Sequence, residues 1–421
     1  MNKYLKWLVT LSGLALMLLG VPMLMGVCVL MLALVGGAGD LDALPFSLSM
    51  AFFLVVTFGC GGVAFYHGMC ALIGRPSGSL RLPPAWALGG SFVLVLVAGL
   101  LMHAAVCGAP LIFPPLFLLA VALPPVTGVA VMVDRHPGAL TWRRALVAFC
   151  AGATVSTSLA IVLNTLLPGL LLALVWGLAD QVLPALEKLL DALAGGRVAD
   201  ALTSRGFLFA LVELAIIAPF GEEFVKPVVV LPLLRRLERR DALLLGACAG
   251  AGFAALEDAL YAGFGLPVWA GILLLRAMGA PLHSLGAGLT TMGWWEVLQR
   301  RPDAGRHWLE RYGLAVGIHA LWNGGSWLVI ALILAGFFGP VPETSLLGLP
   351  EVGLLLALLA VEGAAIWIGA RALSRRLLPA GETLPAHDGM PIERALAVWA
   401  VVCLAVLVPV GLTILRSWWV L

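Results

Sequence analysis

Long apolar runs separated by short polar segments extend along the whole chain. A helix needs about 20 apolar residues to cross the hydrocarbon core of a bilayer. The pattern predicts about eleven transmembrane helices, over residues 6–35, 46–74, 85–106, 110–133, 145–178, 206–234, 241–264, 267–297, 312–338, 351–372 and 394–415. The first run is about twice as long as the apolar region of a signal peptide, so we expect it to be retained as a span.

The positions of lysine and arginine predict how these spans are oriented. When the N-terminus is placed inside, nineteen of the 25 Lys and Arg residues fall in the segments assigned to the cytoplasm, where positive residues are enriched. We therefore expect an N-in, C-out topology. The segment 179–205 alternates Leu and Ala with charged residues at helical spacing, which is typical of an amphipathic helix lying on the membrane.

Composition excludes soluble domains. Hydrophobic residues make up 62% of the chain and charged residues 11%, against about 45–50% and about 25% in soluble domains. The chain is thus expected to be a multi-pass protein of the cell membrane, with the lipid bilayer as its surroundings. The net charge of +2 gives no indication of nucleic-acid binding, and the seven cysteines form no CxxC pair, which argues against a disulfide framework or a zinc ribbon.

Charged residues inside apolar runs concentrate between residues 206 and 338. A charge at the bilayer centre costs about 2.5–3.5 kcal/mol on insertion scales, so such groups must face one another or a water-filled cavity. Six lie near mid-span: Glu222, Glu223, Lys226, Glu257, Asp258 and Arg276. The same spans carry His283, His319 and Asn323, whereas the earlier spans hold only His67, His103 and Asn164, which we interpret as interhelical hydrogen bonders. The pattern predicts one intramembrane site.

Helical spacing relates these residues to one another. Lys226 shares a face with Glu222 at i,i+4 and with Glu223 at i,i+3, and the two Glu side chains point about 100° apart. We therefore expect one of them to react and the other to orient it or bind Lys226. The alternative is a purely structural ion pair, which is a costly way to fill a membrane interior. Pro219 and Pro227 flank the pair and can kink the helix.

The remaining polar residues suggest the rest of the site. Glu257 and Asp258 would form a second carboxylate wall, whereas His283 and His319 lie on adjacent spans and suit metal ligation or acid–base work. His319 and Asn323 share a face at i,i+4. No HExxH, GxSxG or Ser-His-Asp arrangement competes.

Two ways of activating water remain open. Four acids and two bases leave a charge of −2 when both His are neutral, which a divalent cation or retained protons would balance. Zinc or another divalent metal could bind among Glu222, Glu223, Glu257, His283 and His319. Because Lys226 and Arg276 could instead satisfy the carboxylates, we expect a carboxylate-activated water in preference to a metal.

Four segments together carry a family resemblance. GEEFVK at Glu222, Glu223 and Lys226, GFAALED at Glu257, His283, and HALWN at His319 resemble the PrsW family of glutamic-type intramembrane proteases, within the wider CAAX-protease superfamily. The resemblance covers about residues 206–325. The sequence departs from it at Asp258, where Asn is common, and lacks the E-E-x-x-x-R motif of the prenyl-protein endopeptidases. The resemblance implies proteolysis within the membrane, including cleavage of anti-sigma factors.

We therefore expect an all-α polytopic membrane protein with a catalytic four-helix core that cleaves peptide bonds of membrane-protein or peptide substrates. Glu222 or Glu223 would be the general base on water, with Glu257 and His283 completing the site. His319 and Asn323 would stabilise the oxyanion or protonate the leaving amine, while Lys226, Asp258 and Arg276 support the site. The alternatives are a non-enzymatic ion- or proton-coupled transporter or sensor and a scaffold that binds a partner helix.

The charge distribution also divides the chain into three parts. An N-terminal membrane module of about five spans and the interfacial helix would occupy 1–205. The catalytic core of four spans would occupy 206–338, and a two-span extension 339–421.

Overall fold

The computed structural model describes residues 54–104, 109–133, 140–164, 204–338 and 349–377, with short stretches between residues 7 and 52 and single positions at 167 and 202. Within these residues every regular element is a helix, so the predicted all-α class is confirmed. One isolated antiparallel bridge joins Ser79 to Thr141. The predicted interfacial helix and the predicted span 394–415 lie outside the described residues.

Several helices are long and apolar enough to cross a membrane. Seven qualify within the described residues, and an eighth is added if one bent pair counts as a single span. These seven are Val55–Leu72 (π-helix η1, Val55–Gly59, and α3, Cys60–Leu72), α4 (Ala85–Ala104), Leu111–Val133 in α5 (Ala109–Val133), Trp142–Asn164, α11 (Arg239–Phe264), Ala304–Leu332 in α14 (Ala304–Phe338) and Gly353–Leu377 in α15 (Leu349–Leu377). The chain is thus a polytopic membrane protein, whereas the number eleven, the orientation and the three-part division stay predictions.

The span predicted over 267–297 is bent rather than straight. It consists of α12 (Trp269–Met278) and α13 (Pro281–Leu298), which meet at an angle of 42°. Pro281 lies in the first turn of α13, where its missing N–H costs no helical hydrogen bond. Gly279 ends α12, and a Cβ at this position would lie 2.5 Å from the indole of Trp322. The bend therefore follows from the Gly-Ala-Pro sequence at 279–281.

The span predicted over 206–234 is helical but repeatedly interrupted. It comprises α9 (Arg205–Val212), the π-helix η3 (Glu213–Ile217), α10 (Ala218–Val225) and the 3₁₀ turns η4 (Lys226–Val229) and η5 (Leu231–Arg236). Pro227 lies in the first turn of η4 and has no N–H to continue the α-helical ladder. The segment is not among the seven candidate spans, because it carries Glu213, Glu222, Glu223 and Lys226 within a short length.

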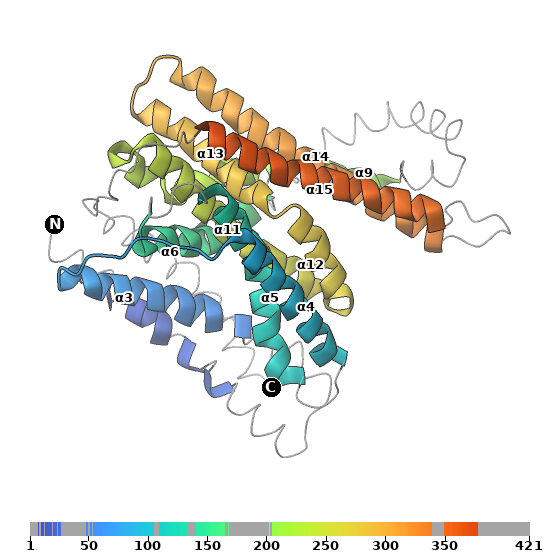
Figure 1. Cartoon of the computed structure of the whole chain (residues 1–421), viewed down its shortest axis with the longest axis horizontal. Coiled ribbons are helices and arrows are strands. Elements are labelled where there is room, and N and C mark those ends of the chain that lie inside the picture. Colours follow the sequence, from blue (N-terminus) through green and yellow to red (C-terminus); the bar gives the residue numbers. More distant parts are fainter. Residues whose placement is uncertain are drawn as a thin grey trace.

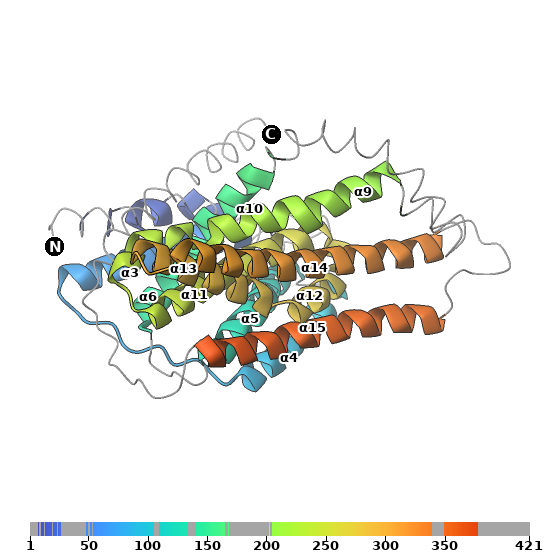
Figure 2. The ribbon, with the colours of Figure 1, turned by 90° about the horizontal axis from the view of Figure 1, so that it is seen from above.

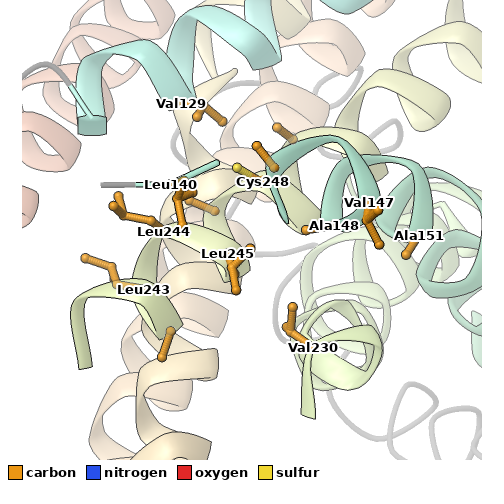
Figure 3. Close-up of a cluster of buried hydrophobic side chains, with 14 of the residues drawn as sticks. Val129, Leu140, Val147, Ala148, Ala151, Val230, Leu243, Leu244, Leu245 and Cys248 are labelled. Carbon is orange, nitrogen blue, oxygen red and sulfur yellow. The ribbon is translucent and has the colours of Figure 1, made fainter. Parts of the chain in front are cut away.

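Helix α11 lies at the centre of the fold. In its apolar window 83% of the residues are buried, against at most 61% in the other candidate spans. Figure 3 shows Leu243, Leu244, Leu245 and Cys248 of α11 beside side chains of α6 (Trp142–Ala151) and beside Val230. Small residues let neighbouring backbones approach closely: a Cβ at Gly252 would overlap the carbonyl of Phe149 on α6.

Helix α14 lies between the segment α9–α10, which precedes it in the chain, and α15, which follows it. Figure 2 shows α9 and α10 along one side of α14 and α15 along the other, Figure 1 shows α14 and α15 running alongside each other, and α13 also packs against α14. The middle of α14 therefore faces α10 and α13 from within the bundle. This arrangement brings polar residues of α10, α13 and α14 close to one another.

Candidate active site

The two glutamates of α10 and the lysine that follows them are buried. Glu222 is 4% exposed, and Glu223 and Lys226 are 0% exposed. The Lys226 ammonium lies 2.5 Å from Glu223 Oε1 and 3.5 Å from Glu222 Oε2. Both spacings expected from the sequence therefore form ion pairs, although the nearer one involves Glu223.

A second charged cluster lies on α11 and α12. Arg276 pairs with Glu257 through Nη2 and with Asp258 through Nε, each at 2.5 Å. The guanidinium also stacks over the ring of Tyr261, 5.1 Å from its centroid. Two carboxylates thus share one arginine, which holds the C-terminal part of α11 against α12.

His283, near the start of α13, connects the two clusters. Its Nδ1 lies 2.8 Å from Lys226 Nζ and its Nε2 lies 3.2 Å from Glu257 Oε2. Because an ammonium only donates, Nδ1 accepts and Nε2–H donates to the carboxylate. His283 is therefore oriented by an ion of each cluster.

His319, in the middle of α14, completes the group. It is 0% exposed, and its Nδ1 lies 2.9 Å from Glu223 Oε1. Because a carboxylate accepts, Nδ1 carries the proton and Nε2 presents a lone pair. That lone pair lies 3.8 Å from Glu222 Oε2, and neither atom has a hydrogen-bond partner in the described part of the chain. Two buried acceptors that face each other need a donor or a cation between them.

Asn164 is a site residue that the sequence analysis did not identify as one. Its Nδ2 donates to Glu222 Oε1 over 3.1 Å. The sequence indicated an interhelical hydrogen bond here, and this is confirmed, but its partner could not be predicted. The only signal was a single amide in an otherwise apolar run.

Asn323, by contrast, does not join the carboxylates. Its Nδ2 donates over 2.9 Å to the carbonyl oxygen of Leu214 in the π-helix η3. Asn323 also lines a cavity of about 220 Å³ together with Arg276, Tyr261 and Trp327. This cavity therefore adjoins the charged cluster through Arg276.

Gly286 on α13 is a second residue that the sequence did not point to. A Cβ at this position would overlap Oε2 of Glu223 and lie 2.9 Å from its Cδ. The Glu223 carboxylate thus rests directly against the backbone of α13. Only glycine leaves room for the carboxylate in its present position.

The donor set around Glu222 fits a divalent cation. Glu222, His283 and His319 each present one ligand atom, and these atoms lie within 4.8 Å of one another. Glu222 Oε2 and His319 Nε2, which lack hydrogen-bond partners among the described residues, are 3.8 Å apart, close to the roughly 3.4 Å that separates two tetrahedral zinc ligands at about 2.0–2.1 Å. Glu223 behind His319 supplies the carboxylate–histidine arrangement that orients metal ligands. The third ligand atom belongs to His283, whose ring nitrogens contact Lys226 through Nδ1 and Glu257 through Nε2.

The buried carboxylate–histidine group lies among helices that are long and apolar enough to cross a membrane. The model of a family described as PrsW family intramembrane metalloprotease matches residues 140–347. This match supports assignment of the chain to the PrsW family and indicates a membrane protease that hydrolyses peptide bonds. The match also includes the helix that carries Asn164. No curated protein and no solved structure matches the chain.

Proposed function

We propose that Glu222 is the general base that activates the hydrolytic water. The observation that carries this assignment is that Glu222 Oε2 and His319 Nε2, 3.8 Å apart in the protein interior, have no hydrogen-bond partner in the described part of the chain. A water there can donate one hydrogen to each atom. Glu222 takes the proton as the water attacks the scissile carbonyl and delivers it to the leaving amine when the C–N bond breaks.

Glu223 and Lys226 act as positioning residues in this proposal. Glu223 accepts from His319 Nδ1 and so directs the lone pair of Nε2 toward the water. Lys226 compensates the charge of Glu223 at 2.5 Å and holds Nδ1 of His283 at 2.8 Å. The predicted alternative, in which Glu223 is the base, is less favourable because Glu223 already has both a cation and an imidazole as partners.

The proposed substrate-binding site consists of Arg276 and the adjoining cavity of about 220 Å³. Arg276 lies 3.2 Å from His283 Nε2 and lines this cavity, and the His283 and His319 rings are 4.9 Å apart. A substrate side chain in the cavity would place its carbonyl near the guanidinium, which can stabilise developing negative charge. Asp258 and Glu257 hold the guanidinium in place.

A divalent cation, zinc being the one that best suits nitrogen and oxygen ligands, fits beside these residues. In this alternative to a water that bridges the same two atoms, Glu222 and His319 would hold the ion, with His283 as the third ligand. When bound, it would polarise the water and the scissile carbonyl. The sequence alone favoured a metal-free site, and the two facing acceptors and the family's description now support the metal alternative.

The substrates of an intramembrane protease are membrane proteins within a bilayer. By resemblance, we propose a single-span protein of the anti-sigma-factor kind, cleaved in the cell membrane. The transporter or sensor alternative gains no support from the described residues or from the family match.

The test compares new N-termini in membranes from cells that express the full chain, its Glu222→Gln variant or a Glu362→Gln control. Glu362 is a carboxylate on α15, outside the charged clusters. We expect N-termini inside transmembrane segments with the wild type and the control, and a loss of about 10²–10⁴-fold with Glu222→Gln. Equal cleavage by a folded Glu222→Gln variant would refute the assignment.

A further inference from the structure

A cavity with several polar side chains in its lining lies far from the candidate active site in the sequence, between α3 and the start of α6. Its volume is about 610 Å³. The residues that give it its chemistry are Tyr66, His67, Arg75, Ser77, Trp142 and Arg143. No Asp or Glu is found among the described residues that line it. Among the described residues, the charged side chains of the cavity are therefore positive, with no acidic group to compensate them.

Arg143 shows the imbalance most clearly. It is 9% exposed, and its guanidinium donates to two neutral acceptors, His67 Nδ1 at 3.4 Å and the carbonyl oxygen of Arg75 at 2.8 Å. The next residue, Arg144, is paired with Asp241 at 3.1 Å. A buried charge is normally paired, and Arg143 has no such carboxylate in the described part of the chain. An anion in the cavity would supply the missing charge.

The position of the cavity indicates where that anion comes from. Arg75 follows the C-terminal end of the candidate span Val55–Leu72, and Arg143 is the second residue of the span Trp142–Asn164. Both arginines thus lie at the end of a membrane-spanning helix. Tyr66 and Trp142 border the cavity and are 54% and 39% exposed, and such aromatic residues are enriched where a membrane meets water.

We propose that this cavity binds the phosphate of an anionic phospholipid headgroup. Arg143 and Arg75 contact the phosphate, and Tyr66 and Trp142 lie beside the glycerol region. The acyl chains lie along the exposed apolar side chains of α3, such as Met69 at 37% exposure. Basic pockets between transmembrane helices commonly bind such headgroups. This inference does not depend on the proteolytic mechanism.

Native mass spectrometry of the full-length protein tests the proposal with added phosphatidylglycerol, phosphatidylcholine or inorganic phosphate. We expect one tightly retained phosphatidylglycerol, weaker phosphatidylcholine and no displacement by millimolar inorganic phosphate. Arg75→Gln, an exposed position, should weaken phosphatidylglycerol binding about fivefold, the equivalent of about 1 kcal/mol per basic residue. Arg143→Gln should weaken it more than tenfold.

The control is Arg81→Gln, which removes an exposed arginine outside the lining of this cavity and should leave binding unchanged. Because Arg143 is buried, lipid binding by Arg143→Gln is interpreted only if the thermal midpoint of this variant stays near that of the wild type. If it does not, the test rests on lipid binding by Arg75→Gln. Unchanged binding in Arg75→Gln would overturn the proposal. Equal retention of phosphatidylcholine, or displacement by inorganic phosphate, would overturn the assignment to an anionic lipid.

Discussion

Replacing Gly286 by alanine should disable the site without a change in any charged or hydrogen-bonding group. The new Cβ would overlap Oε2 of Glu223, whose other oxygen is held by Lys226 and His319. The carboxylate has 0% exposure, and the new Cβ would lie closer to its Oε2 than real Cβ atoms approach. The carboxylate must therefore shift by several tenths of an ångström and lengthen one of these contacts.

The expected loss of activity follows from lengthening of the hydrogen bond between His319 and Glu223. The His319–Glu223 hydrogen bond is 2.9 Å long, and N–H···O bonds weaken beyond about 3.2 Å. Loss of a carboxylate behind a ligating or catalytic imidazole typically costs about 10–100-fold in metal affinity or activity, the equivalent of about 1.4–2.7 kcal/mol. Alanine is also a better helix former than glycine by about 0.8–1.0 kcal/mol, so the thermal midpoint should change little.

The assay measures cleavage of a reconstituted single-span substrate in vesicles, with the thermal midpoint measured in parallel. The matched control is Gly288→Ala on the same helix, where a Cβ would meet Leu243 of α11 and not Glu223. This control should lose stability in preference to activity. Wild-type cleavage by a folded Gly286→Ala variant would refute the positioning role of Glu223.

Three further predictions concern the partners of the base, the arginine cluster and the metal. Asn164→Leu removes the only hydrogen-bond donor to Glu222 in the described part of the chain, so cleavage should fall about tenfold at an unchanged midpoint; an unaffected rate would exclude a role for the amide. Arg276→Met should destabilise the protein by about 3–5 kcal/mol by denaturation, because it leaves buried carboxylates unpaired, and adding Asp258→Asn should recover part of this loss; no recovery would contradict the pairing. Metal analysis of the purified protein should find a divalent ion that is lost in His319→Ala, whereas full retention would place the metal elsewhere.

The gathering of the site residues could be predicted from the sequence, because charges in apolar runs must face one another. The structure places Glu222, Glu223 and Lys226 beside His283 and His319, as the sequence indicated. Helical spacing also relates Lys226 correctly to both glutamates. These inferences hold because they depend on local periodicity and on the cost of burial, which do not require knowledge of the tertiary fold.

Details that depend on how helices rotate against one another could not be predicted. Asn323 shares a face with His319 along α14, yet it turns to the carbonyl of Leu214 because the π-helix η3 passes beside it. Asn164 lies on a distant helix and reaches Glu222 only through tertiary packing. Likewise, the sequence does not distinguish Gly286 from the other glycines, because its role depends on the contact between the backbone of α13 and Glu223.

Charge compensation explains why one glutamate, rather than another, should react. Three of the four buried carboxylates at the site lie 2.5 Å from a cation. Glu222 differs, because its nearest cation, Lys226, is 3.5 Å away and its hydrogen bond comes from the neutral amide of Asn164. A carboxylate that is already fully paired gains little by taking a proton, whereas an incompletely paired one in a dry interior gains most. The sequence could count four acids against two bases, but only the distances show that the least compensated charge falls on Glu222, beside His319 Nε2, which has no hydrogen-bond partner in the described part of the chain.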